Sequence, residues 1–145
     1  MEKRKRVKIK TKSPEETKRA GEEFGRKLKP GDIVLVIGEL GAGKSVFIRG
    51  IAKGLKIKEI VKSPSFVIIQ EFEGKYPFYH VDLYRTDVQE IAELGIFELM
   101  DKGIVCIEWG ERILPLLKHV KKIIVNIKKL EGNIREIEIH DTSIN

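Results

Sequence analysis

The sequence has a single cysteine and no apolar run long enough to cross a bilayer. One cysteine excludes an internal disulfide, and Cys106, inside the apolar run 104–107, is expected to be a small buried side chain. The basic start of the chain is not followed by the hydrophobic stretch that a signal peptide needs. These absences predict a soluble, unexported protein of the reducing cytoplasm that has no membrane partner.

The net charge of +6 arises at the start of the chain. Residues 1–12 hold seven basic side chains and one acidic side chain, and the other residues balance at 21 basic against 21 acidic. Composition therefore does not require a broad basic face for nucleic acid. Two interpretations of the basic segment stay open: a solvated sheet edge, which is the commoner case, or a surface for RNA or an acidic partner.

The strongest motif follows the uninterrupted apolar run 33–37. Gly38, Gly43, Lys44 and Ser45 have the spacing of a P-loop. Glycines permit a tight turn whose N–H groups face phosphate oxygens, lysine supplies a mobile charge for the β- and γ-phosphates, and the hydroxyl suits Mg²⁺. Shuffling this composition would give these four positions about one time in a hundred. The motif predicts nucleotide binding, and the alternative is a chance match in a glycine-rich turn.

Hydrolysis or phosphoryl transfer also needs an acidic group near Mg²⁺ at the end of a neighbouring strand. Glu108 ends the apolar run 104–107, where a Walker-B acid would lie. Asp82 ends a strand of mixed character and also suits a helix cap or an ion pair. Both acids are therefore candidates for the second half of the chemistry.

The order of the expected elements predicts an α/β fold. The runs 33–37 and 104–107 are apolar on both faces, which indicates central parallel strands covered by helices. We expect further strands at 7–12, 67–72, 78–82, 123–127 and 134–139, helices that begin at Ser13, Ser45 and Asp87, and a short helix over 113–117. The prediction is one domain, 1–145, with a P-loop NTPase-like three-layer fold, a central parallel sheet and antiparallel strands at its edges.

Four motifs in this order and spacing, 38–45, 63–66, 80–85 and 107–109, resemble the TsaE (YjeE) family of small bacterial P-loop ATPases. The resemblance covers nearly the whole chain. It implies an ATP-binding, ATP-hydrolysing protein that uses Mg²⁺ and is required for N6-threonylcarbamoyladenosine formation beside the anticodon of tRNA. It also implies that the partner proteins TsaB and TsaD carry out the chemistry on the tRNA, so that tRNA is contacted only through their complex.

The resemblance also assigns roles to residues. It implies a phosphate cradle made of Gly38, Gly41, Ala42, Gly43, Lys44 and Ser45. It implies the catalytic residues Lys44, Asp82 and Glu108 and a metal site made of Ser45 and Glu108. It also implies a switch-like loop for partners, made of Ser63, Pro64, Ser65 and Phe66. Trp109 and Arg85 match the family pattern, and Trp109 is expected at the nucleotide. The family usually has threonine at the positions of Ser45 and Ser65, and serine keeps the hydroxyl.

Three questions stay open from the sequence. Arg85 suits either charge neutralisation on the transferring phosphoryl group or an ion pair with a neighbouring carboxylate. The guanine-reading pattern Asn-Lys-x-Asp is absent, which favours ATP, and Thr11 is a candidate for contact with adenine. The alternative functions are a small-molecule kinase, although the eight arginines form no lid-like cluster, and a non-enzymatic RNA-binding module.

Overall fold

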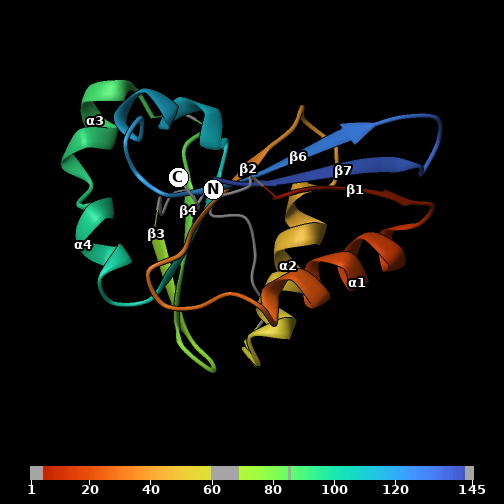
Figure 1. The fold of residues 1–145 in the computed structure, drawn as a ribbon, viewed down its shortest axis with the longest axis horizontal. Helices are drawn as coiled ribbons and strands as arrows, with labels where there is room; N and C mark the ends of the chain where they lie inside the picture. The colour runs from red at the N-terminus through yellow and green to blue at the C-terminus, as the bar shows by residue number, and fades with distance from the viewer. Residues whose placement is uncertain (1–4, 60–68, 85, 143–145) are drawn as a thin grey trace.

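Seven strands form one mixed sheet in the computed structural model, which describes residues 5–59, 69–84 and 86–142 (Figure 1). The strands are β1 (Lys5–Thr11), β2 (Ile33–Ile37), β3 (Ile69–Glu73), β4 (Pro77–Asp82), β5 (Ile104–Glu108), β6 (Ile123–Lys129) and β7 (Arg135–Asp141), in the spatial order β1-β7-β6-β2-β5-β4-β3. The central strands β6, β2, β5 and β4 are parallel, whereas β1, β7 and β3 pair antiparallel. The predicted sheet arrangement is confirmed.

Helices cover both faces of this sheet (Figure 1). One face carries α1 (Pro14–Gly25) and α2 (Lys44–Gly54), and the other carries α3 (Val88–Glu93), α4 (Ile96–Met100) and the 3₁₀ turns η1 (Gly110–Arg112) and η2 (Leu114–Leu116). Alternate residues of β2 supply the two cores, since Val34 packs with the α2 side and Leu35 with the α3 side. The result is the expected three-layer fold.

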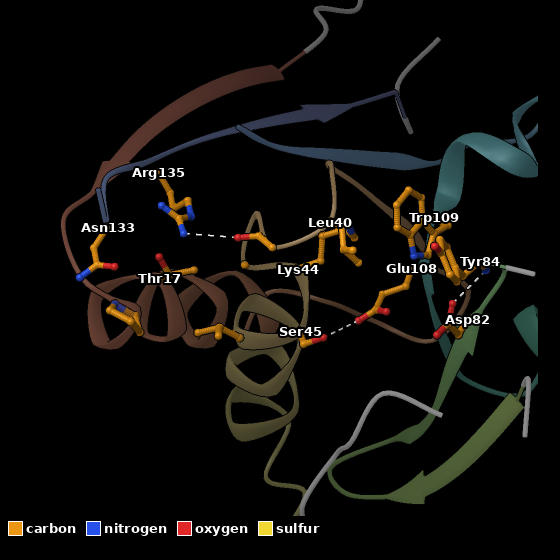
Figure 2. Close-up of a pocket in the computed structure, with 14 residues that line it drawn as sticks. Thr17, Leu40, Lys44, Ser45, Asp82, Tyr84, Glu108, Trp109, Asn133 and Arg135 are labelled. Atoms are coloured by element: carbon orange, nitrogen blue, oxygen red, sulfur yellow. Dashed lines mark hydrogen bonds between the residues drawn. The ribbon is translucent and has the colours of Figure 1, made fainter. Parts of the chain in front are cut away.

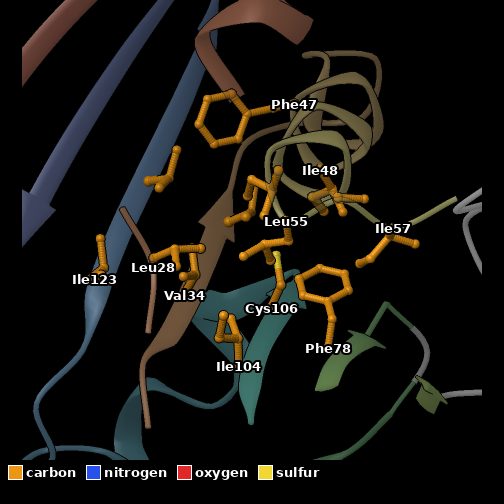
Figure 3. Packing of buried hydrophobic residues seen from close by; sticks show 14 of the residues in the cluster. Leu28, Val34, Phe47, Ile48, Leu55, Ile57, Phe78, Ile104, Cys106 and Ile123 are labelled. Carbon is orange, nitrogen blue, oxygen red and sulfur yellow. The ribbon is translucent and has the colours of Figure 1, made fainter. Parts of the chain in front are cut away.

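Strands β2, β4 and β5 and helix α2 build the larger core (Figure 3). Val34, Cys106 and Phe78 come from the three strands and lie against Ile48 of the helix and Leu55, the residue that follows it. All five side chains are fully buried. The expectation of a buried cysteine is confirmed, and burial raises the pKa of the Cys106 thiol far above its ordinary value. This core fixes α2, and with it the loop that precedes α2.

Helices α1 and α2 contact each other through glycines as well as through the ring pair Phe24 and Phe47, whose centroids lie 5.7 Å apart. A Cβ atom at Gly50 would lie 2.1 Å from the Lys18 carbonyl oxygen, and one at Gly21 would lie 2.2 Å from the Phe47 carbonyl oxygen. Gly25 and Gly54 are equally closed to a side chain. The two backbones therefore pack directly against each other, a contact that the sequence analysis missed.

Two helical predictions need correction. The short helix expected over 113–117, with a break at Pro115, is instead the single 3₁₀ turn η2, because Pro115 lacks the N–H that a continuing α-helix would use. The helix that starts at Asp87 is interrupted at Gly95, whose φ of +73° ends α3 and begins α4. The expected N-caps are confirmed, since the Ser13 and Asp87 side chains accept hydrogen bonds from the N–H groups of Glu16 and Glu90.

Candidate functional site

A cavity of about 420 Å³ opens at the carboxyl edge of the parallel strands (Figure 2). It joins the predicted P-loop to residues from α1, β4, β5 and the β6–β7 hairpin. The lining residues are Pro14, Thr17, Leu40, Gly41, Gly43, Lys44, Ser45, Val46, Asp82, Tyr84, Glu108, Trp109, Asn133 and Arg135. The carboxyl edge is where open α/β sheets bind ligands, so the fold places the predicted site residues in the expected position.

The loop between β2 and α2 has the backbone that a phosphate cradle needs. Gly41 and Gly43 adopt positive φ angles of +80° and +104°, which disfavour any residue with a Cβ atom. Gly38 is closed to a side chain as well, because a Cβ atom would lie 2.7 Å from the Ile127 carbonyl oxygen. Helix α2 begins at Lys44 without a side-chain cap among the described residues. Its first N–H groups and its positive end are therefore available to an anion in the cavity.

Lys44 lies beside this loop. Its Nζ donates hydrogen bonds to the carbonyl oxygens of Gly38 and Glu39, the second at 2.9 Å, and lies 4.0 Å from the centroid of the Trp109 ring. Burial lowers the pKa of Lys44, while the nearby carboxylates of Glu108 and others act in the opposite direction. The ammonium is thus held next to the cradle by weak neutral acceptors, which a phosphate would outcompete on charge.

Ser45 and Glu108 meet on the floor of the cavity (Figure 2). Ser45 Oγ donates to Glu108 Oε1 over 3.0 Å, and Glu108 is only 3% exposed at the end of β5. Burial alone would raise the pKa of Glu108, but His80, the Ser45 hydroxyl and the Lys44 charge outweigh it and hold the pKa below its usual value. A hydroxyl and an ionised carboxylate side by side are oxygen donors of the kind that Mg²⁺ takes in proteins, so the donor set fits this ion.

Asp82 is the neighbour of Glu108 in the β4–β5 register and has the opposite electrostatic character. Its pKa is raised by burial and by the charge of Glu108, although the Tyr84 N–H donates a 2.9 Å hydrogen bond to Asp82 Oδ1. Two adjacent acids whose pKa values move apart suit two different tasks. The ionised Glu108 suits a metal, and the more basic Asp82 suits a proton or a water molecule.

Trp109 follows Glu108 with a left-handed backbone, at φ 60° and ψ 43°, which is uncommon for a bulky side chain. This turn carries the ring over the cavity, where it packs against Tyr84 with ring centroids 4.9 Å apart. The sequence prediction placed Trp109 at the nucleotide site, and the structure places it on the cavity wall beside Lys44.

The opposite end of the cavity was not foreseen. Thr17 and Arg135 lie there together with Asn133 (Figure 2). Thr11, the candidate adenine contact, does not line the cavity: it is 3% exposed, and its hydroxyl is hydrogen-bonded to that of Thr17 at 2.7 Å. The sequence predicts the capped start of α1, but no sequence motif indicates a role for Arg135 in this cavity.

The predicted partner loop falls outside the described residues. This applies to Ser63, Pro64, Ser65 and Phe66, and also to Arg85. Their roles stay predictions.

The basic N-terminal strand is matched by acids on its neighbour. Arg6 Nε lies 3.9 Å from Glu138 Oε2, and the β1–β7 register pairs Lys8 with Glu138 and Lys10 with Glu136. Opposite charges across an antiparallel pair attract, which neutralises the row of cations on the sheet. This pattern agrees with the interpretation of the segment as a solvated edge.

Comparisons with known proteins come to the same family. The family model described as "Threonylcarbamoyl adenosine biosynthesis protein TsaE" matches residues 11–137. The chain is 41% identical to the tRNA threonylcarbamoyladenosine biosynthesis protein TsaE of Bacillus subtilis, over 92% of this chain and 84% of the relative. It is 42% identical to the TsaE protein of Rickettsia prowazekii, over 88% of this chain and 90% of the relative.

The fold is also shared with a solved structure. The crystal structure of Bacillus subtilis YdiB superimposes with a TM-score of 0.79 at 33% sequence identity and covers 98% of this chain and 89% of that one. Among the described residues, no helix combines the length and the apolar character that a bilayer span requires. With a family model over most of its length and relatives above 40% identity, the chain belongs to the TsaE family.

Proposed function

We propose that this protein is a Mg²⁺-dependent ATPase that supports the formation of threonylcarbamoyladenosine in tRNA, together with TsaB and TsaD. The observation that carries this proposal is the Ser45–Glu108 contact next to a glycine-rich loop and an uncapped helix start. This arrangement supplies positive potential for phosphates and oxygen donors for their metal ion at one point. The names of the relatives support the tRNA pathway.

The side chains divide the work of hydrolysis. Lys44 and the N–H groups of the loop would bind the β- and γ-phosphates and neutralise their charge. Ser45 and Glu108 would hold Mg²⁺, which supplies Lewis-acid stabilisation of the phosphate oxygens. Asp82 would orient the attacking water and accept its proton as the new oxygen–phosphorus bond forms and the bond from the γ-phosphorus to the bridging oxygen breaks. The products are ADP and inorganic phosphate, and the proton passes from Asp82 to solvent.

The position of the metal donors also orients the nucleotide. Glu108 and Asp82 lie at one end of the cavity, and Thr17 and Arg135 lie at the other (Figure 2). The γ-phosphate therefore belongs at the Asp82 end and the nucleoside at the Thr17 end. In this proposal Thr17 replaces Thr11 as the nucleoside contact, and Thr11 holds the Thr17 hydroxyl through a hydrogen bond.

The alternative functions receive less support. Among the described residues, Arg135 is the only arginine that lines the cavity, so this part of the chain offers no lid of arginines of the kind that kinases close over phosphates. The cations of β1 face the acids of β7, which weakens the case for that strand as an RNA surface.

Steady-state ATP turnover, measured with and without TsaB and TsaD, tests the proposal. We expect slow hydrolysis by the protein alone and acceleration by the TsaB–TsaD pair, since no arginine of the described chain lies at the metal end to neutralise the transferring group. Phe66→Ala is expected to reduce the stimulation while ATP affinity holds. Fast hydrolysis that ignores the partners would contradict the proposal, as would loss of ATP affinity in Phe66→Ala.

A further inference from the structure

Arg135 connects the β6–β7 hairpin to the loop that precedes α2. Its Nε donates to the Ala42 carbonyl oxygen at 2.8 Å. Its Nη2 donates to the Gly41 carbonyl oxygen at 3.4 Å (Figure 2). The third guanidinium nitrogen, Nη1, donates to the carbonyl oxygens of Gly132 and Ile134 at 2.9 and 3.1 Å. One side chain thus ties the hairpin backbone to two successive peptide groups that lie more than 90 residues away in the sequence.

The peptide geometry gives this contact a consequence for the cradle. In a trans peptide the carbonyl and the N–H point in opposite directions. When Arg135 holds the Ala42 carbonyl, it therefore directs the N–H of Gly43 away from the guanidinium. Gly43 adopts φ +104° and lines the cavity. Glycine normally permits several backbone orientations, and the hydrogen bond of Arg135 to the Ala42 carbonyl selects one of them at this position. Fixed N–H groups around alternating glycines are what an anion-binding nest requires.

The place of Arg135 separates this role from direct catalysis. The side chain lies at the Thr17 end of the cavity, opposite Asp82 and Tyr84 (Figure 2). Its donors are directed at backbone oxygens of the loop and the hairpin. A guanidinium in this position does not reach the metal end, where charge develops during phosphoryl transfer.

We propose that Arg135 is a positioning residue of the phosphate cradle: its planar fork fixes the peptide groups from Gly41 to Gly43 so that the Gly43 N–H is preorganised for the diphosphate of a bound nucleotide. The Ala42 N–H is held within the loop, where it donates to the Glu39 carbonyl oxygen at 3.0 Å. The inference deepens the proposed function, because it takes the ligand to be the nucleotide of that same site. It makes the β6–β7 hairpin a determinant of nucleotide affinity. The fork matters more than the charge, since lysine presents a point charge that does not hold two carbonyls in a plane.

The test is calorimetric titration of ADP and of pyrophosphate, both without Mg²⁺, into the parent protein, Arg135→Ala, Arg135→Lys and the control Arg112→Ala. Arg112 also donates to a backbone carbonyl, that of Thr86, but lies outside the cavity lining. We expect Arg135→Ala to weaken both ligands by about tenfold to a hundredfold, the range of hydrogen bonds that involve a charged group. Arg135→Lys should recover little of this loss, and Arg112→Ala should bind as the parent does.

A second readout follows the loop without any ligand. Hydrogen exchange at the Gly43 N–H should be faster in Arg135→Ala and in Arg135→Lys than in the parent, while the midpoint of thermal unfolding changes no more than in Arg112→Ala. Full recovery of affinity by Arg135→Lys would overturn the positioning role in favour of a simple charge, and unchanged affinity in Arg135→Ala would overturn it outright. Failure of the parent itself to bind ADP or ATP would instead refute the proposed function.

Discussion

Ser45 Oγ lies 3.0 Å from Glu108 Oε1, although the two residues are 63 positions apart in the chain. The contact forms because β2 and β5 are parallel neighbours, so the loop after one strand and the acid that ends the other reach the same edge of the sheet. A hydroxyl from the first turn of α2 and a buried carboxylate thereby form one pair of oxygen donors.

Glu108→Gln is expected to remove the effect of Mg²⁺ on nucleotide binding. The amide keeps an oxygen that can accept the Ser45 hydrogen bond, so the fold should hold, but the charge that attracts the metal is lost. ADP titrations with and without Mg²⁺ should give the same Kd in this variant. Turnover should fall roughly a hundredfold or more, because Lewis-acid stabilisation is worth several kcal/mol. The matched control is Glu111→Gln, an exposed acid three residues later, and an equal loss there would count against the assignment.

Asp82→Asn is expected to lower turnover by about 10²–10⁴-fold, the range for a general base, yet to increase the stability of the fold at neutral pH. Burial raises the pKa of Asp82 above 3.8, so its ionisation opposes folding. Asparagine keeps the oxygen that accepts from the Tyr84 N–H without the charge.

The pH dependence of this stability gain has a definite sign. Well below pH 3.8 Asp82 is neutral in the native and the unfolded state, and the variant should match the parent. The gain should grow as the pH rises from about 3.8 to the elevated pKa of the native state and should then stay constant. Urea unfolding at a series of pH values measures it. A variant that is less stable than the parent at neutral pH would show that the burial of Asp82 does not govern its ionisation.

His80→Leu is expected to weaken metal binding. His80 is 1% exposed, and within the described chain neither ring nitrogen has a hydrogen-bond partner; Nε2 lies 3.7 Å from Glu108 Oε1. Removal of the imidazole removes a neighbour that lowers the pKa of Glu108.

We therefore expect about tenfold weaker Mg²⁺ dependence of ADP binding, the lower range for supporting groups of metal ligands. His80→Gln, which keeps an N–H donor, should restore the metal dependence. Phe78→Leu is the control, two residues earlier on the same strand and fully buried. An equal loss of metal dependence in Phe78→Leu would reduce the role of His80 to packing.

Gly50→Ala is expected to destabilise the protein by about 1–3 kcal/mol, the usual cost of overpacking, although alanine is the better helix former. The reason is the 2.1 Å approach of the added Cβ atom to the Lys18 carbonyl oxygen. Lys53→Ala, on the exposed face of the same helix, should change the free energy of unfolding little. Urea unfolding of the parent and the two variants measures these changes in the free energy of unfolding. A Gly50→Ala variant as stable as the parent would mean that α1 and α2 can move apart to accept the added Cβ atom without cost.

Local patterns in the sequence predicted most of the fold. The apolar runs 33–37 and 104–107 identified the central strands, and Ser13 and Asp87 identified helix starts, because each pattern depends on neighbours in the chain. The P-loop and its two acids could be predicted for the same reason, because each lies in a short motif at the end of a strand. The structure brings these motifs together, as parallel pairing requires.

The features that were missed depend on contacts between distant segments. The glycine contact between α1 and α2 had a signal in the sequence, the repeated spacing of Gly21 with Gly25 and of Gly50 with Gly54. The apolar stripe of α1 is the commoner indication of helix packing, and the prediction rested on that stripe alone. Arg135 had no signal, because a single arginine at the start of a strand acquires its role only when β7 pairs with β6.

The most direct test of the nucleotide site is a calorimetric titration of ATP with Mg²⁺ into the parent protein and into Lys44→Ala. Lys44 Nζ touches only neutral carbonyls and the Trp109 ring among the contacts described above, so its charge is free to act on phosphates. Lys58→Ala, an exposed lysine outside the cavity lining, is the control. The account predicts one site in the parent and in Lys58→Ala, and affinity at least about tenfold to a hundredfold weaker in Lys44→Ala. An affinity for ATP with Mg²⁺ in Lys44→Ala equal to that of the parent would contradict it.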